Sequence, residues 1–130
     1  MEAKELMVGD LCCEWNNDHT EKHVVKVTQI QKEGVRDRYN VFHENDWIEP
    51  IPLTAEMLVK NGFKGIGLYV YTDLDTKITW TGITKMLTLK TIDIETVSAF
   101  KVECKCEYVH ELQHALRLVG LNEVADNLKV

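Results

Sequence analysis

Short apolar runs separated by polar turns make up the first fifty positions of the chain. The polar run 16–22 and the pair Glu33-Gly34 indicate turns, and Pro50 and Pro52 favour an extended exit from this region. β-Branched and aromatic residues dominate the segments between the turns, which predicts a series of short strands. These strands are expected over about residues 11–15, 24–30 and 39–43, with a further short one at Val35.

The second half begins with a well-bounded helix and then returns to strand patterns. Thr54 can cap a helix over about residues 55–61, Glu56 suits its positive end, and Asn61-Gly62-Phe63 is typical of a left-handed stop that brings Phe63 onto Leu58. The segments that follow predict an antiparallel meander with one face covered by helices. Its strands are expected over about residues 68–71, 77–81 and 86–90 and in a long stretch within 92–106.

A final amphipathic helix is predicted over about residues 108–119. Gly120 should end it, Leu121 can then meet Leu116, and Asn122 can cap one further turn. The apolar residues recur at helical spacing and form one continuous stripe, which should pack against the sheet. The stripe consists of Tyr108, Val109, Leu112, Ala115, Leu116 and Val119.

The order of the early strands carries a resemblance in fold. Val8-Gly9-Asp10 forms a turn entering a strand, and with the short strands that follow it is similar to a small SH3-like β-barrel. We therefore expect an α+β protein. An SH3-like β subdomain over residues 1–52 should pack with the antiparallel meander of residues 53–130, which is flanked by the short helix and the C-terminal amphipathic helix.

Composition and charge narrow the classes of function. The chain has 130 residues, 45% of them hydrophobic and 28% charged, which is typical of globular proteins. It lacks a signal-peptide pattern and any apolar run of bilayer-spanning length, so we expect a cytoplasmic location without membrane contact. The net charge of −6 disfavours general phosphate-backbone binding. Specific nucleic-acid contact by the barrel-like half stays open, and it would require Lys26, Lys32, Arg36 and Arg38 to gather on one face.

Four cysteines form two pairs, and neither has the spacing of two intervening residues that suits a tetrahedral metal. Adjacent Cys12 and Cys13 should point to opposite faces of a strand. Cys104 and Cys106 should share the buried face of an alternating strand. We expect small reduced core residues, with a metal site or a redox pair as the alternatives.

The predicted last helix contains a motif that is typical of zinc peptidases. His110-Glu111-Leu112-Gln113-His114 matches H-E-x-x-H, in which two histidines one turn apart bind zinc and the glutamate acts as base. We expect both histidines on the side opposite the apolar stripe, available to an ion. A zinc-dependent hydrolase with ligands His110 and His114, base Glu111 and zinc as cofactor is therefore an alternative function.

The surrounding sequence disfavours that alternative. Arg117 and Gly120 stand where the metzincin extension requires glycine and histidine. Glu123 is a formal third ligand, although it falls in what resembles a terminal turn. Arg117 also lies one turn beyond His114, where a permanent cation opposes a divalent ion. We therefore expect no metal ligand, no cofactor and no catalytic residue.

Tryptophans supply the candidate binding residues. Trp15, Trp47 and Trp80 would form an aromatic ligand-binding surface if they converged, whereas core packing is the alternative. We select Trp15 and Trp47. The other histidines lack a partner at a matching spacing and are expected to be solvated: His19, His23 and His43.

Three segments carry a further resemblance: Trp47-Ile48-Glu49-Pro50-Ile51-Pro52-Leu53-Thr54, the ending Asn61-Gly62-Phe63, and the closing run 108–118. Through them most of the chain resembles a family of small uncharacterised proteins encoded in genomes and mobile elements of gut bacteria. The resemblance implies no established activity. It also implies variation at the positions of Glu111 and His114, which disfavours catalysis.

These observations predict a non-enzymatic binding or accessory module that engages a protein partner. The zinc-dependent hydrolase and specific nucleic-acid binding are the alternatives. Self-association into a homo-oligomer stays open.

Overall fold

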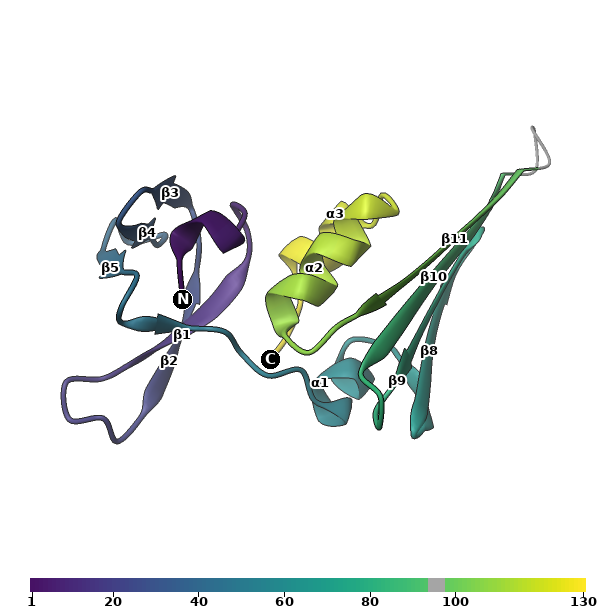
Figure 1. Ribbon diagram of the computed structural model, residues 1–130, viewed down its shortest axis with the longest axis horizontal. Coiled ribbons are helices and arrows are strands. Elements are labelled where there is room, and N and C mark those ends of the chain that lie inside the picture. The colour runs from purple at the N-terminus through teal and green to yellow at the C-terminus, as the bar shows by residue number, and fades with distance from the viewer. Residues whose placement is uncertain (94–97) are drawn as a thin grey trace. The chain divides into compact units, whose positions relative to one another are not determined.

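The computed structural model describes residues 1–93 and 98–130 of the chain (Figure 1). The fold is α+β, as the sequence predicts, with three antiparallel sheets and a pair of helices near the C-terminus. The chain forms two compact units, Met1–Pro52 with Tyr108–His114 and Leu53–Glu107 with Ala115–Val130. Helix α2 (Val109–Leu118) contributes its beginning to the first unit and its end to the second.

The first unit contains two small sheets and a short 3-10 helix, η1 (Ala3–Glu5). Within the part of the chain that the structure describes, these sheets do not close into a barrel, so the closed barrel expected from the sequence is not formed. One sheet has the order β2-β1-β6, with β1 (Leu11–Trp15), β2 (Lys22–Lys26) and β6 (Ile48–Glu49). The other has the order β3-β4-β5, with β3 (Gln29–Gln31), β4 (Gly34–Arg36) and β5 (Phe42–Glu44). Both sheets contribute to one buried cluster of Ala3, Leu6, Cys12, Val25, Val27, Val35 and Ile48.

The strand expected over residues 24–30 is divided between the two sheets. The Val27 N–H donates to the Asp10 carbonyl oxygen at 2.9 Å, beside β1. The next residue, Thr28, donates its N–H to the Arg36 carbonyl oxygen, also at 2.9 Å. The backbone hydrogen bonds of these two consecutive residues thus go to partners in or beside different sheets. Each buried peptide group needs a partner, and here the partner changes between Val27 and Thr28.

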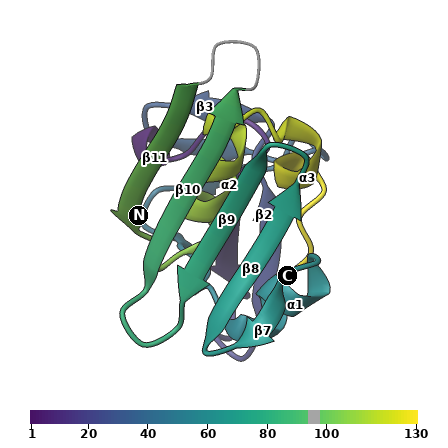
Figure 2. The same cartoon turned by 90° about the vertical axis from the view of Figure 1, so that its right-hand side faces the viewer.

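The second unit is built on a five-stranded antiparallel sheet with the order β11-β10-β9-β8-β7 (Figure 2). Alternate residues of two central strands are buried, namely Ile78 and Trp80 in β9 and Leu87 and Leu89 in β10. This period of two is the reason that these segments form strands with one buried face. The strands are β7 (Lys64–Ile66), β8 (Leu68–Asp73), β9 (Thr76–Thr81), β10 (Met86–Asp93) and β11 (Ser98–Lys105). The stretch expected within 92–106 thus belongs to two strands, and its positions 94–97 lie outside the described residues.

Helix α1 (Ala55–Lys60) has the ends that the sequence predicts. The Thr54 hydroxyl oxygen accepts the N–H of Met57 at 3.3 Å. At the other end Gly62 has φ +93°, and the Phe63 N–H donates to the Leu58 carbonyl oxygen at 3.0 Å. The cap and the left-handed stop are therefore confirmed.

The end of α2 is confirmed in the same way. Gly120 has φ +83°, and the Leu121 N–H donates to the Leu116 carbonyl oxygen at 2.8 Å. Helix α3 (Asn122–Asp126) follows, but Leu121 rather than Asn122 occupies the N-cap position and makes no side-chain cap. The predicted Asn122 cap is therefore wrong. No helix among the described residues is long and apolar enough to cross a membrane.

Candidate functional site

The H-E-x-x-H motif lies in the first half of α2, where it packs within the first unit. The expectation that its histidines face away from the packed side is wrong, because His110 is only 8% exposed. Gln113 is fully buried as well. The apolar stripe of the predicted helix does not include the face that carries His110 and Gln113. Polar side chains can also be buried where they find hydrogen-bond partners, and a pattern of apolar residues does not predict this.

Glu111 has a structural partner at the N-terminal end of α2, in the residue directly before the helix. One of its carboxylate oxygens accepts the backbone N–H of Tyr108 at 3.1 Å. The first N–H groups of a helix have no partner within the helix, and a glutamate reaching back to one of them is a known cap. Glu111 therefore occupies the position of a capping-box glutamate.

Gln113 and His114 attach α2 to the turn that precedes β1. The Gln113 side chain accepts the Leu11 N–H at 2.8 Å and donates to the Gly9 carbonyl oxygen at 3.1 Å. The Nε2 atom of His114 lies 2.5 Å from a carboxylate oxygen of Asp10, whose side chain is buried. Neither role was predicted, although the turn residues Gly9 and Asp10 were part of the SH3-like pattern.

A cleft opens beside the same helix. It has a volume of about 500 Å³, and its lining consists of Met1, Glu5, Pro50, Tyr108, His110, Glu111 and His114. The His110 ring stacks on Tyr108 at a centroid distance of 5.9 Å and meets His114 edge-on at 5.7 Å. Burial, reinforced by the neighbouring His114, lowers the pKa of His110 below its ordinary value. Its Nδ1 atom is buried and makes no hydrogen bond to the residues that the structure describes.

The described residues do not assemble a metal site at this motif. Among them, no three His, Cys, Asp or Glu side chains form a group that could hold a metal ion. The His114 Nε2 atom already faces Asp10. The formal third ligand, Glu123, is exposed on α3 and belongs to the second unit.

Trp15 and Trp47, the candidate binding residues, approach the same histidine. The His19 ring stacks on Trp15 at a centroid distance of 6.0 Å and lies 6.2 Å from the Trp47 ring, which is tilted toward it. Trp47 is 45% exposed. We call Trp15, His19 and Trp47 the aromatic surface. Trp80 is not part of it, because it is buried in the second unit, where its Nε1 atom donates to the Cys106 carbonyl oxygen at 2.9 Å.

Two charged side chains complete the surroundings of Trp15. The Lys22 ammonium lies 4.7 Å from the centre of the Trp15 ring and 3.0 Å from a Glu49 carboxylate oxygen. Glu49 also accepts the Trp15 Nε1–H at 3.3 Å. The hydrogen bond from Lys22 lowers the pKa of Glu49, so this carboxylate stays ionised beside the rings.

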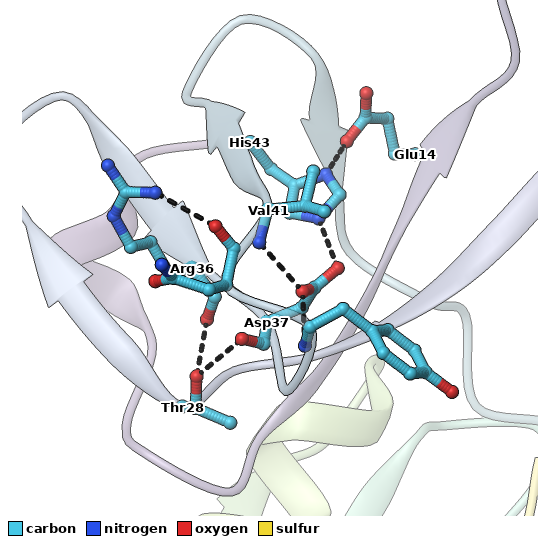
Figure 3. Close-up of polar contacts among 8 residues, drawn as sticks. Glu14, Thr28, Arg36, Asp37, Val41 and His43 are labelled. Atoms are coloured by element: carbon cyan, nitrogen blue, oxygen red, sulfur yellow. Dashed lines mark hydrogen bonds and ion pairs between the residues drawn. The ribbon is translucent and has the colours of Figure 1, made fainter.

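His43 lies between two carboxylates, an arrangement that sequence spacing did not reveal (Figure 3). Its Nδ1 atom contacts Glu14, and its Nε2 atom lies 2.8 Å from Asp37. Burial opposes ionisation of His43, but the hydrogen bonds to Asp37 and Glu14 outweigh it and raise the pKa. The prediction of a solvated His43 is therefore wrong. Glu14 comes from β1 and His43 from β5, so the contact joins the two sheets of the first unit.

Burial of the cysteines follows the strand pattern only in part. Cys106 is buried as expected, whereas Cys104 is half-buried because β11 is an edge strand of its sheet. Cys12 and Cys13 are both buried. Burial, with the nearby Cys13, Asp10 and Glu14, raises the pKa of Cys12 to about 12. All four residues lie in the described parts of the chain, and none forms a disulfide.

No protein-family model, curated protein or solved structure matches this chain. Its function is therefore inferred from the geometry of its own residues. The aromatic surface and the His110 cleft are accessible places in the first unit where aromatic or titratable side chains lie close together. Of these, the aromatic surface includes both residues that the sequence singled out for binding.

Proposed function

We propose that this protein is a non-enzymatic binding module whose aromatic surface engages a protein partner. The observation that carries the proposal is the convergence of Trp15, His19 and Trp47 from separate segments of the first unit, with neighbouring ring centroids 6.0 and 6.2 Å apart. Tryptophan is among the residues that contribute most to binding at protein interfaces, because a rigid ring covers much area at a small entropic cost.

The polar groups around Trp15 favour a partner that contacts ring faces. The Trp15 Nε1–H and the Lys22 ammonium both contact the Glu49 carboxylate. These polar groups therefore already have hydrogen-bond or ion-pair partners within the protein. An extended, proline-containing segment suits such a surface. Its conformation is already restricted, and it packs on aromatic side chains without needing many hydrogen bonds.

A distant SH3-like relationship of residues 1–52 is part of this proposal, since domains of that kind bind such segments in aromatic grooves. Membership of the gut-bacterial family described above is likewise proposed. It adds no activity of its own.

Selection from a display library of proline-containing peptides, followed by calorimetric titration of the selected peptides, tests the proposal. Trp47→Ala should weaken binding by about tenfold or more, as expected for an interface tryptophan. Trp47 is 45% exposed, so we expect the variant to keep the native circular dichroism spectrum. Tyr39→Ala is the matched control, because Tyr39 is a 72% exposed aromatic residue of the same unit outside the aromatic surface.

Peptides that bind the parent protein and the Tyr39→Ala variant equally, but not the Trp47→Ala variant, would support the proposal. A library that yields no binder, or binders indifferent to Trp47, would contradict it.

The zinc-dependent hydrolase is the second candidate function. The observation that favours it is the buried Nδ1 of His110, which lies beside His114 and makes no hydrogen bond within the described part of the chain. Two contacts weigh against it, because Glu111 caps its helix and His114 faces Asp10. Metal analysis of protein purified without a His tag separates the two functions, since a catalytic site should retain about one zinc per chain.

A further inference from the structure

The cleft beside His110 has the chemistry of a binding site that is separate from the aromatic surface. His110 is 8% exposed, and its ring lines the cleft together with Tyr108, on which it stacks. The buried Nδ1 atom of His110 makes no hydrogen bond to any residue that the structure describes, and such groups in native proteins call for an explanation. The ring that carries this nitrogen lines the cleft, and the Cβ–Cγ torsion of histidine has two ring orientations that exchange the places of Nδ1 and Cδ2.

The charges at the cleft favour a cation. Glu5 and Glu111 both line it, and both act on His110 in the direction that favours its protonated form. No lysine or arginine is among the described residues that line the cleft, and the ammonium group of Met1, which also lines it, donates to the Asn45 and Ile48 carbonyl oxygens at 3.2 Å. The Nε2 atom of His114 lies 2.5 Å from the buried carboxylate of Asp10. Burial keeps His110 itself neutral near pH 7, which leaves it able to accept a hydrogen bond.

The dimensions of the cleft distinguish an organic cation from a metal ion. A bound metal needs several donor atoms within about 2.0–2.6 Å, and the described residues do not assemble such a group. A volume of about 500 Å³ instead suits a ligand of several non-hydrogen atoms. Pro50 and the faces of Tyr108 and His110 can then pack against an aliphatic stem.

We propose that the His110 cleft binds a primary alkylammonium group, with its ammonium held between Glu5 and Glu111 and donating to the His110 ring. The group can belong to a lysine side chain of a polypeptide or to a free diamine. Both sources present the same ammonium on an aliphatic stem. The site is independent of the aromatic surface, so either can exist without the other.

Titration with two amines tests this site and distinguishes the sources. The probes are Nα-acetyl-lysine methylamide and 1,4-diaminobutane, followed by the His110 ring resonances in NMR and by calorimetry at low salt. We expect saturable shifts of the His110 resonances at millimolar amine concentrations. The tighter of the two probes identifies the source. The norleucine analogue of the first probe, which lacks the ammonium, should not bind.

Charge-neutral variants locate the binding. Glu5→Gln and Glu111→Gln should each weaken amine binding by about two- to fivefold, the usual range for a partly exposed ion pair. Glutamine at position 111 keeps an oxygen that can accept the Tyr108 N–H, so the helix cap is preserved. Glu33→Gln is the matched control, because it removes the same charge from an exposed position of the same unit outside the cleft.

Four results would overturn the proposal. The first is binding of the norleucine analogue as tight as that of the lysine derivative. The second is a failure of both amines to shift the His110 resonances. The third is weakening by Glu33→Gln equal to that by the cleft variants. The fourth is stoichiometric binding of ZnCl₂ that displaces the amines, which would make the cleft a metal site.

Discussion

His114 and Asp10 are separated by 104 positions in the chain, yet the His114 Nε2 atom lies 2.5 Å from an Asp10 carboxylate oxygen. The same oxygen accepts the Met7 N–H at 2.8 Å. Because the Asp10 side chain has no exposure to solvent, it depends on these partners for its stability in the fold. The second histidine of the H-E-x-x-H motif therefore serves to attach α2 to the start of β1.

Removing that attachment should destabilise the protein. His114→Ala leaves the buried Asp10 carboxylate short of one partner, which should lower the free energy of unfolding by about 1–3 kcal/mol. His23→Ala is the control, since His23 is exposed on β2 and should change stability by less than about 0.5 kcal/mol. Urea denaturation monitored by circular dichroism measures both. Equal stability of the two variants would show that the contact with Asp10 contributes nothing.

Local features of this fold were predictable, whereas most of its functional contacts were not. The Thr54 cap and the endings at Gly62 and Gly120 depend on a few neighbouring residues, so sequence patterns predict them. Glu14, one partner of His43, lies 29 positions away, and the Asp10 partner of His114 lies 104 positions away, beyond the reach of any spacing rule. The division of the predicted strand 24–30 has the same cause, because the backbone of Val27 and Thr28 bonds to distant segments.

The two tryptophans of the aromatic surface illustrate the same limit. Residue type alone identified Trp15 and Trp47. His19 is an exposed loop residue, as predicted, but its ring contacts with both tryptophans were not predicted. Only the folded loop brings it there. His19 has φ +56°, and its N–H donates to the Asn16 carbonyl oxygen at 3.0 Å, a conformation that an apolar/polar pattern does not encode.

His43 should make stability depend on pH. Its folded-state pKa is raised, so its contribution is present in full below the unfolded pKa near 6.5 and is lost as the pH rises through the folded value. Hydrogen bonds with His43 and with the backbone lower the pKa of Asp37, which has the opposite effect, since that contribution is lost only as the pH falls through the lowered value. Urea denaturation from mildly acidic to alkaline pH should therefore show the parent losing stability as His43 deprotonates.

His43→Gln should lack that loss on the alkaline side while keeping the dependence due to other groups. NMR titration of the parent measures the His43 pKa directly. A His43 pKa at or below the ordinary histidine value of 6.5 would contradict the arrangement with Glu14 and Asp37.

The thiols should differ in reactivity according to burial. Cys104 is half-buried on edge strand β11 and should be alkylated first in the native protein. Cys12 is fully buried, and its pKa of about 12 keeps it a protonated thiol, so it should react only after denaturation. Cys106, at 1% exposure, should behave like Cys12. Peptide mapping by mass spectrometry after timed alkylation checks this order, and early labelling of Cys106 would contradict its placement in the core.

Two neighbouring substitutions in α2 separate its structural role from a catalytic one. Leu112 is 1% exposed, so Leu112→Ala should cost about 2–5 kcal/mol through lost burial and an unfilled cavity. Glu111→Gln keeps an oxygen for the Tyr108 N–H and should change stability by less than about 0.5 kcal/mol. A catalytic base would behave differently, because its loss abolishes hydrolysis and leaves the fold intact. Thermal and urea denaturation of both variants, with a peptidase assay of the parent and of Glu111→Gln in the presence of zinc, test the two roles together. A Leu112→Ala variant as stable as the parent would refute the packing of α2. Zinc-dependent hydrolysis that disappears in Glu111→Gln would show that the protein is an enzyme and contradict the proposed binding module.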